Sequence, residues 1–378
     1  MSTTRPAPSP RATGDRCPGA LRLHEADDGF LARVRLPGGL LDAAQVLALA
    51  DAAEALGDGY LHLTARGNVE IRGLGEDAGL RLSAVLSASG LLPSATHERV
   101  RNIVATPAAG LDGHSHSHSG SLVDVVRRTD RLLCETPRAA DLSGRFLLGL
   151  DDGRGDVLAL QPDVAARWID DDLVEIVLGG TPVLLFPAAQ AHKGVVAAAV
   201  AFLDARDEAG ETGWRLAELA SPARVIAHVV DALFRAFPKA EPTTESTEMP
   251  ASTHPRASDP SNEHASHDPS EPLAPGPLGE SSLNVVLRLG SAPAATWRAL
   301  AAAAQDSDGL VRSTPARSVV LGGLSASARK NVLSRAASLG LIVDPRDPAF
   351  GVSACTGLPG CASSARDVRA DVEAALGE

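Results

Sequence analysis

The chain begins with a polar arm. After it, the spacing of the apolar residues changes several times between the period of a strand and that of a helix. Strict alternation of apolar and polar side chains is typical of a half-buried strand, whereas apolar residues at helical spacing are typical of an amphipathic helix. By these criteria the first unit contains strands at 30–36, 60–64 and 69–72 and helices at 42–56 and 76–89. Asp42 stands at the expected N-cap of the first helix, and Gly57 stands where that helix would end. The pattern therefore predicts an α+β unit in which helices cover one face of a small sheet.

The same succession returns late in the chain. It predicts strands at 284–289, 310–314 and 318–321 and helices at 292–305 and 325–339. Thr64 and Arg66 of the first copy are loosely echoed by Thr314 and Arg317 of the second. An internal duplication predicts two similar halves that pack about a pseudo-two-fold axis. Each half would then send its arginine turn towards one shared cleft.

A different pattern lies between the two copies. It predicts strands at 146–150, 157–160, 173–178 and 181–186 and helices at 122–133, 195–205 and 222–237. Residues 151–156 are acidic and rich in glycine, and Gly179 and Gly180 are adjacent, so each stretch is predicted to close a β-hairpin. Residues 238–280 are dominated by Pro, Ser, Thr, Glu and His, which cannot bury enough apolar surface to offset the entropy lost on ordering. This stretch is therefore predicted to be a disordered linker.

Together these patterns divide the chain into segments. They are a disordered arm at 1–16, a first half-domain at 17–95, a central domain at 96–237, a disordered linker at 238–280, a second half-domain at 281–350 and a cysteine-containing tail at 351–378.

Composition narrows the classes of protein that remain. Of the 378 residues 44% are hydrophobic but only 3% are aromatic, so Ala, Leu and Val must form the core. A formal net charge of -12 argues against nonspecific nucleic-acid binding. The chain has no apolar run of about 18 residues that would indicate a membrane span, and its N-terminus lacks the apolar segment of a signal peptide. These features predict a protein of the reducing cytoplasm.

Cys355 and Cys361 are the strongest candidates for binding a metal. They enclose Thr-Gly-Leu-Pro-Gly, and thiolates at such short spacing are soft ligands that suit an iron–sulfur cluster, zinc or copper(I). The alternatives are a disulfide or two small buried side chains, because one pair is only half of a four-ligand set. His114, His116 and His118 alternate with serine and could hold a non-haem iron, nickel or zinc, although a low-complexity loop insertion is the simpler explanation.

Five arginines stand at predicted turns or strand ends, where their side chains could converge on one ligand. They are Arg66, Arg72, Arg101, Arg145 and Arg317. Guanidinium groups bind carboxylates in a bidentate manner and stay charged at any relevant pH, so such a cleft would suit a ligand that carries many carboxylates. The alternative for each arginine alone is a solvated side chain beside a turn. No phosphate-binding loop or dinucleotide-binding glycine fingerprint is present, so electrons would come from a partner protein or an unrecognised site.

Several of these stretches resemble motifs of the sulfite and nitrite reductase superfamily. Residues 63–74, Leu-Thr-Ala-Arg-Gly-Asn-Val-Glu-Ile-Arg-Gly-Leu, resemble its Thr-Ser/Thr-Arg motif, and Arg101-Asn102 resembles its second anion-binding motif. Residues 142–146 and 151–156 resemble the stretch that supplies further ligand contacts, although only Arg145 is basic where a basic pair is expected before Phe146, since residue 144 is glycine. Residues 354–361 resemble the first cysteine pair of the [4Fe–4S] site. Cys17-Pro-Gly19 and the acidic stretch are most similar to the precorrin-3B synthase family of cobalamin-pathway monooxygenases.

The resemblance implies an α+β fold with duplicated ferredoxin-like half-domains and a sulfite/nitrite reductase-type α/β domain, the second such domain being truncated. It implies the O2- and NADH-dependent oxidation of precorrin-3A, a tetrapyrrole with many carboxylates, by an enzyme with a [4Fe–4S] cluster and, in some members, a non-haem iron. Arg66, Arg72, Arg101, Asn102, Arg145 and Arg317 would contact the tetrapyrrole, and Cys355 and Cys361 would ligate the cluster.

This sequence departs from the family pattern because no Cys-x-x-x-Cys pair follows Cys361. Either the chain is truncated, or the cluster is incomplete or lost, or its other ligands come from elsewhere. Two alternatives therefore stay open. One is a sulfite or nitrite reductase that binds siroheme, a tetrapyrrole with the same carboxylate periphery. The other is a truncated relative that binds a tetrapyrrole without catalysis.

Overall fold

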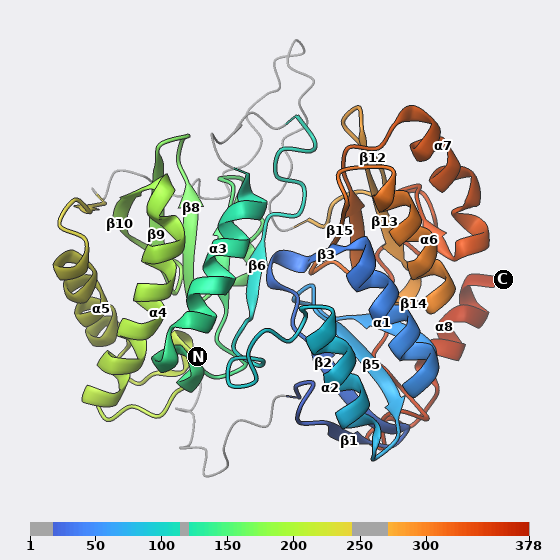
Figure 1. Ribbon diagram of the computed structural model, residues 1–378, viewed down its shortest axis with the longest axis horizontal. Coiled ribbons are helices and arrows are strands. Elements are labelled where there is room, and N and C mark those ends of the chain that lie inside the picture. Colours follow the sequence, from blue (N-terminus) through green and yellow to red (C-terminus); the bar gives the residue numbers. More distant parts are fainter. Residues whose placement is uncertain (1–17, 114–120, 244–270, 378) are drawn as a thin grey trace, which may run out of the picture.

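The computed structural model describes residues 18–113, 121–243 and 271–377. The predicted arm at 1–16 and the central part of the predicted linker lie outside these residues. Figure 1 shows the central domain on one side and the two half-domains next to each other on the other side. None of the described helices is long and apolar enough to cross a membrane.

Each half-domain is built on an antiparallel sheet. The first sheet has the order β1 (His24–Ala26), β2 (Gly29–Val34), β5 (Val69–Leu74), β4 (Tyr60–Leu63) and β14 (Ser291–Pro293). The second has the order β12 (Gly276–Leu278), β13 (Ser282–Leu287), β16 (Ser318–Leu321), β15 (Leu310–Ser313) and β3 (Leu40–Asp42), with β17 (Leu341–Ile342) also paired to β13. The predicted duplicated α+β architecture is confirmed.

The two half-domains exchange one strand each. The strand β3 of the first copy pairs with β15 of the second, and β14 of the second copy pairs with β4 of the first. The two pairings have equivalent registers, since Leu41 lies opposite Val311 and Ala292 lies opposite Leu61. This reciprocal exchange locks the halves together about the predicted pseudo-two-fold axis.

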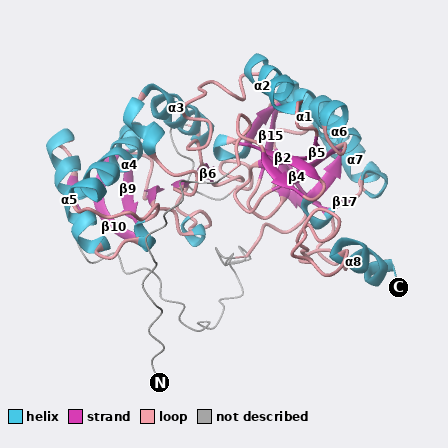
Figure 2. Ribbon diagram, turned by 90° about the horizontal axis from the view of Figure 1, so that it is seen from below, coloured by secondary structure: helices cyan, strands magenta, loops and turns pink. Residues whose placement is uncertain are grey.

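Helices cover one face of both sheets, as Figure 2 shows. They are α1 (Ala43–Leu56) and α2 (Ala78–Ala88) of the first copy and α6 (Ala294–Gln305) and α7 (Ala326–Arg335) of the second. Asp42 caps α1, because its carboxylate accepts from the Gln45 backbone N–H at 2.7 Å while the Gln45 side chain accepts from the Asp42 N–H. The helices α1 and α6 pack against each other, and one continuous apolar core of mainly Ala, Leu and Val serves both halves. The predicted small-residue core is confirmed.

The central domain has its own core and a sheet of mixed direction. Its strands are ordered β11 (Glu241–Pro242), β10 (Thr181–Pro187), β9 (Leu173–Leu178), β8 (Val164–Trp168), β7 (Leu148–Asp151) and β6 (Ile103–Ala105). Its helices are α3 (Leu122–Glu135), α4 (Ala191–Glu208) and α5 (Pro222–Ala236). The predicted hairpin around Gly179 and Gly180 is confirmed by the antiparallel pair β9 and β10. Both described flanks of the predicted linker form short strands, β11 and β12.

The predicted hairpin over residues 146–160 is wrong. The strands β7 and β8 are parallel, and β6 is parallel to β7. Parallel neighbours need a connection of about a dozen residues, and residues 152–163 provide it. The Asp151 carboxylate winds this connection into a loop by accepting from the backbone N–H groups of residues 153, 155, 157 and 158, so no two-residue turn can form.

The last helix, α8 (Val368–Gly377), follows the cysteine stretch.

Candidate functional site

The two arginine turns adopt the same backbone fold. In the first arginine turn (residues 64–68) the Thr64 N–H donates to the Asn68 carbonyl at 2.9 Å, and in the second (residues 314–318) the Thr314 N–H donates to the Ser318 carbonyl at 2.9 Å. Gly67 has φ +67° and Arg317 has φ +61°, so these two residues occupy equivalent positions. The sequence matched Arg317 with Arg66, but the counterpart of Arg66 is Ala316. Only the first turn therefore carries an arginine at that position.

The two turns meet in the middle of the paired half-domains. The Ser313 hydroxyl, just before the second turn, hydrogen bonds to the Gly67 carbonyl and lies 3.2 Å from the Gly39 carbonyl. A Cβ on Gly67 would lie 3.2 Å from the Ser313 carbonyl oxygen and 3.7 Å from the Pro315 nitrogen. The predicted convergence of the two turns is therefore present in the structure.

A buried chain of amides joins the first arginine turn to the central domain. The Asn68 side chain accepts from the Leu36 N–H at 2.9 Å and donates to the Asn102 side-chain oxygen at 3.3 Å. The Asn102 amide in turn donates to the Phe146 carbonyl at 3.0 Å. Asn102, predicted to contact a ligand, thus has its side chain engaged between the two domains.

Arg35 strengthens the same junction and was not anticipated from the sequence. Its side chain is only 3% exposed, and it donates to the Arg99 carbonyl at 3.2 Å and the Gly144 carbonyl at 3.4 Å. A buried guanidinium that binds backbone carbonyls fixes the segment that carries Arg145. No local pattern marks Arg35, because it falls within the alternating residues of the predicted strand at 30–36, although β2 ends at Val34.

Arg101 supports the fold of the central domain. Its guanidinium forms a bidentate pair with Asp130, at 2.7 and 2.8 Å, and donates to the Leu91 carbonyl at 2.8 Å. Its three donor nitrogens are all engaged within the protein, and its side chain is 5% exposed. A direct contact between Arg101 and a ligand would require this arrangement to open.

Arg66 and Arg145 are partly accessible beside this junction. Arg145 pairs with Glu218 at 3.0 Å and lies over the Trp214 ring with 5.8 Å between its guanidinium carbon and the ring centroid. Arg66 is half-buried, and its backbone N–H donates to the Thr64 hydroxyl at 3.3 Å. These two side chains are the predicted cations best placed to meet a ligand at the junction.

Arg72 holds the cysteine turn (residues 355–361) against the first half-domain. It pairs with both carboxylate oxygens of Asp28 at 2.9 Å and donates to the Gly360 carbonyl at 3.0 Å. Asp27, the neighbour of Asp28, accepts from the Ala362 N–H. Arg72 was predicted to bind a ligand, and the structure places it in contact with the cysteine turn.

A second arginine beside the cysteine turn comes from α8. Arg369 donates to the Ser291 hydroxyl at 2.7 Å and the Leu289 carbonyl at 3.1 Å. Burial, together with the positive charges of Arg317 and Arg72, lowers the pKa of Arg369. A cavity of about 420 Å³ between β4, β14 and the cysteine turn is lined by Arg72 and Arg369, among others.

The two candidate cluster cysteines lie in one tight turn. Cys355 is exposed and Cys361 is half-buried, and neither is in a disulfide. Gly357 has φ +65°, and a Cβ there would lie 2.9 Å from the Val368 nitrogen, so the tight turn requires glycine. Burial, followed by the charge of Asp130, raises the pKa of Cys134 on α3 to about 11, so this thiol stays neutral near pH 7. The described residues thus offer two thiolates in one turn where a [4Fe–4S] cluster takes four.

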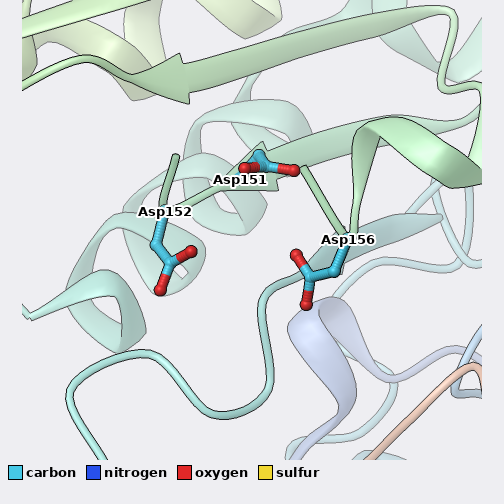
Figure 3. Close-up of side chains that lie close together, drawn as sticks. All are labelled: Asp151, Asp152 and Asp156. Carbon is cyan, nitrogen blue, oxygen red and sulfur yellow. The ribbon is translucent and has the colours of Figure 1, made fainter. Parts of the chain in front are cut away.

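The acidic stretch forms a loop at the end of β7, and Figure 3 shows its three carboxylates together. Ligand atoms of Asp151, Asp152 and Asp156 lie within 4.8 Å of one another. Asp151 is saturated by four backbone N–H groups, and Asp152 pairs with Arg154 at 2.7 Å. Asp156 accepts a hydrogen bond from the Thr106 hydroxyl at 2.7 Å. The predicted alternative histidine site, His114, His116 and His118, lies outside the described residues.

Comparisons with known proteins identify related chains. Residues 22–86 match the nitrite/sulfite reductase ferredoxin-like half domain. The chain is 26% identical over 361 residues to a precorrin-3B synthase of Sinorhizobium, covering 92% of this chain and 70% of that protein. It is 34% identical over 100 residues to the ferredoxin–nitrite reductase of Synechococcus elongatus, which is 26% of this chain and 20% of that enzyme.

A solved structure shows the same fold. The NirA protein of Mycobacterium tuberculosis superposes with a TM-score of 0.67 at 18% identity, over 92% of this chain and 65% of the NirA chain. The present chain thus spans less than two thirds of that protein's length. These relatives confirm the resemblance of the chain to the sulfite and nitrite reductase superfamily of oxidoreductases and, within it, to precorrin-3B synthase.

Proposed function

We propose that this protein is a cytoplasmic oxidoreductase of cobalamin biosynthesis that converts precorrin-3A to precorrin-3B with O2 and NADH. The observation that carries this proposal is the similarity to precorrin-3B synthase, which extends over 92% of the chain and is not confined to one domain. Shorter matches to nitrite reductases agree with an oxidoreductase but cover only single regions. The substrate would be a tetrapyrrole whose many carboxylates need cationic partners.

The junction between the first arginine turn and the central domain is the best place for such a ligand. Arg66 and Arg145 stand there with partly accessible side chains, while the buried amides of Asn68 and Asn102 hold the two domains in register. Arg317 lies elsewhere, because its side chain is beside Gly290 and its charge acts on Arg369, on the side of the cysteine turn. Guanidinium groups at a fixed junction bind carboxylates without the cost of ordering flexible side chains.

Cys355 and Cys361 would hold part of a [4Fe–4S] cluster, and the electrons for the reaction would come from NADH, directly or through a partner protein. A bound cluster supplies one-electron transfer. Arg72 would keep the cysteine turn in place through the Gly360 carbonyl. The two further cluster ligands are not among the described residues, and the family resemblance also implies a non-haem iron in some members.

The test uses protein purified and reconstituted without oxygen. Iron and acid-labile sulfide are measured first, and the protein is then given precorrin-3A, NADH and O2. The expected product gains one oxygen atom in its mass, with NADH consumed in equal amount. Arg66→Gln should weaken tetrapyrrole binding. Arg335 is an exposed arginine on α7, away from the junction, so the control Arg335→Gln removes the same charge and should leave binding unchanged. Tight binding of the tetrapyrrole without any product would contradict the activity and favour a binding protein.

A sulfite or nitrite reductase that contains siroheme is the second candidate. It is favoured by the 34% identity to a ferredoxin–nitrite reductase over 100 residues. Such a protein would show a haem-like visible spectrum as purified and would consume nitrite or sulfite with a reduced electron donor. A colourless or purely iron–sulfur spectrum would rule it out.

A further inference from the structure

A cavity of about 350 Å³ lies where the central domain meets the second half-domain. Its walls are largely apolar and include Ala105, Pro107, Val157, Leu160, Leu273 and Pro315. Thr314, Asp156 and Glu271 add polar groups. An apolar cavity with few polar groups and a volume in the range of about 300–1,000 Å³ is typical of small-molecule sites.

The cavity opens at the edge of the sheet where ligands usually bind in parallel α/β structures. The strands β6 and β7 are parallel, so Thr106 and the acidic loop follow their carboxyl ends at the same edge. Ligands of open parallel sheets bind outside the carboxyl ends of the strands.

The cavity also adjoins the first arginine turn. Thr314 and Pro315 line it, and both lie within 4 Å of the position of a Cβ on Gly67, the neighbour of Arg66. A ligand that reaches Arg66 with one carboxylate could therefore extend part of its macrocycle into this space.

Asp156 differs from the other two carboxylates of its loop. The Thr106 hydroxyl accepts from the Asp152 N–H at 3.2 Å, so its own proton is donated to Asp156 Oδ1 at 2.7 Å. Among the described residues, that is the one hydrogen bond that the Asp156 carboxylate receives. The second carboxylate oxygen of Asp156 is therefore available to a ligand in the cavity.

Several charges act on Asp156. Burial first, and then the charge of Asp151, raises the pKa of Asp156 to about 7, with Asp152 acting in the same direction. The Thr106 hydrogen bond and the charge of Arg154 oppose this rise. Across the cavity Glu271 is the other carboxylate, and the wall from the second half-domain, residues 314–316, carries no charge.

We propose that this cavity receives one side of the tetrapyrrole macrocycle and that Asp156, when it is neutral, donates a hydrogen bond to a side-chain carboxylate of the bound ligand. The inference rests on the proposed function, since it takes the polycarboxylate tetrapyrrole as the ligand. A neutral Asp156 can donate a hydrogen bond to the ligand and does not repel its carboxylates. An ionised Asp156 cannot donate this hydrogen bond and repels the ligand carboxylates. Ligand binding and protonation of Asp156 therefore favour each other.

The test is the pH dependence of binding, measured on the full chain with uroporphyrin as the probe, by fluorescence titration from pH 6 to pH 9. In this range the carboxylates of the probe stay ionised. The dissociation constant of the wild type should rise above pH 7, with a limiting slope of about tenfold per pH unit. In Asp156→Asn the rise should disappear, while the matched change Glu271→Gln at the same cavity should keep it.

A second variant tests the cause of the inflection. Thr106→Val removes the hydrogen bond that favours the ionised carboxylate, so the inflection should move to higher pH. A flat wild-type profile, or a rise that survives in Asp156→Asn, would overturn the inference while the proposed function stands, provided that Arg66→Gln still weakens binding. No binding of the probe at any pH would instead count against the proposed function.

Discussion

Replacement of Gly39 by alanine tests the strand exchange that unites the two half-domains. Gly39 precedes β3 directly and has φ +70°. A Cβ at this position would lie 1.9 Å from the carbonyl oxygen of Ser313, on β15 of the other half. No side-chain rotation can relieve this contact, because both atoms belong to, or are fixed by, the backbone. We therefore expect Gly39→Ala to separate β3 from β15 or to displace the Ser313 turn.

The expected cost has two parts. An alanine forced into a left-handed conformation costs about 1–2 kcal/mol. Loss of the β3–β15 pairing, which includes Leu41 opposite Val311, removes hydrogen bonds that contribute about 1 kcal/mol each and exposes part of the buried Leu41. The total destabilisation should be about 3–5 kcal/mol.

Gly59→Ala is the matched control. Gly59 has φ +81°, but a Cβ there would meet nothing within 4 Å. It should therefore cost only the conformational part, about 1–2 kcal/mol. Urea unfolding of both variants measures the difference, and hydrogen exchange of the β3 and β15 amides shows where the structure opens. Equal destabilisation by the two variants, with unchanged protection of β3 and β15, would refute the reciprocal exchange.

Two further predictions concern the acidic loop. Asp151→Asn should destabilise the protein by at least about 4 kcal/mol, since it removes charged hydrogen bonds worth about 1.5–3 kcal/mol each. The control Asp306→Asn, at an exposed site, should change the stability by under about 0.5 kcal/mol. Equal urea midpoints for the two variants would contradict this prediction. Asp156 has a folded-state pKa of about 7, raised from its ordinary value of 3.8, so its protonation contributes stability that is full below about pH 4 and is lost as the pH rises through 7. The stability of Asp156→Asn relative to wild type should therefore increase between pH 4 and pH 7, by up to about 4 kcal/mol. If urea unfolding across this range shows no such trend, the pKa of Asp156 is not raised in the folded protein.

The sequence alone determined the elements with a regular period and their duplication. The helix at 42–56 begins at the predicted cap Asp42, and the repeated strand, helix and strand pattern predicted two halves about a pseudo-two-fold axis. These features depend on the chemistry of neighbouring residues, which side-chain spacing reports directly. The composition likewise predicted a core of Ala, Leu and Val, whereas the packing of α1 on α6 came only from the structure.

The tertiary structure decided the features that depend on distant partners. The exchanged strands β3 and β14 have three residues each, which is too short for a period to be recognised. The acidic stretch became a loop between parallel strands because Asp151 binds the backbone ahead of it, which no turn signal indicates. Arg72 and Arg101, predicted as ligand contacts, pair with Asp28 and Asp130. An arginine pairs with a carboxylate that folding brings close to it, and the sequence alone does not predict which carboxylate that is.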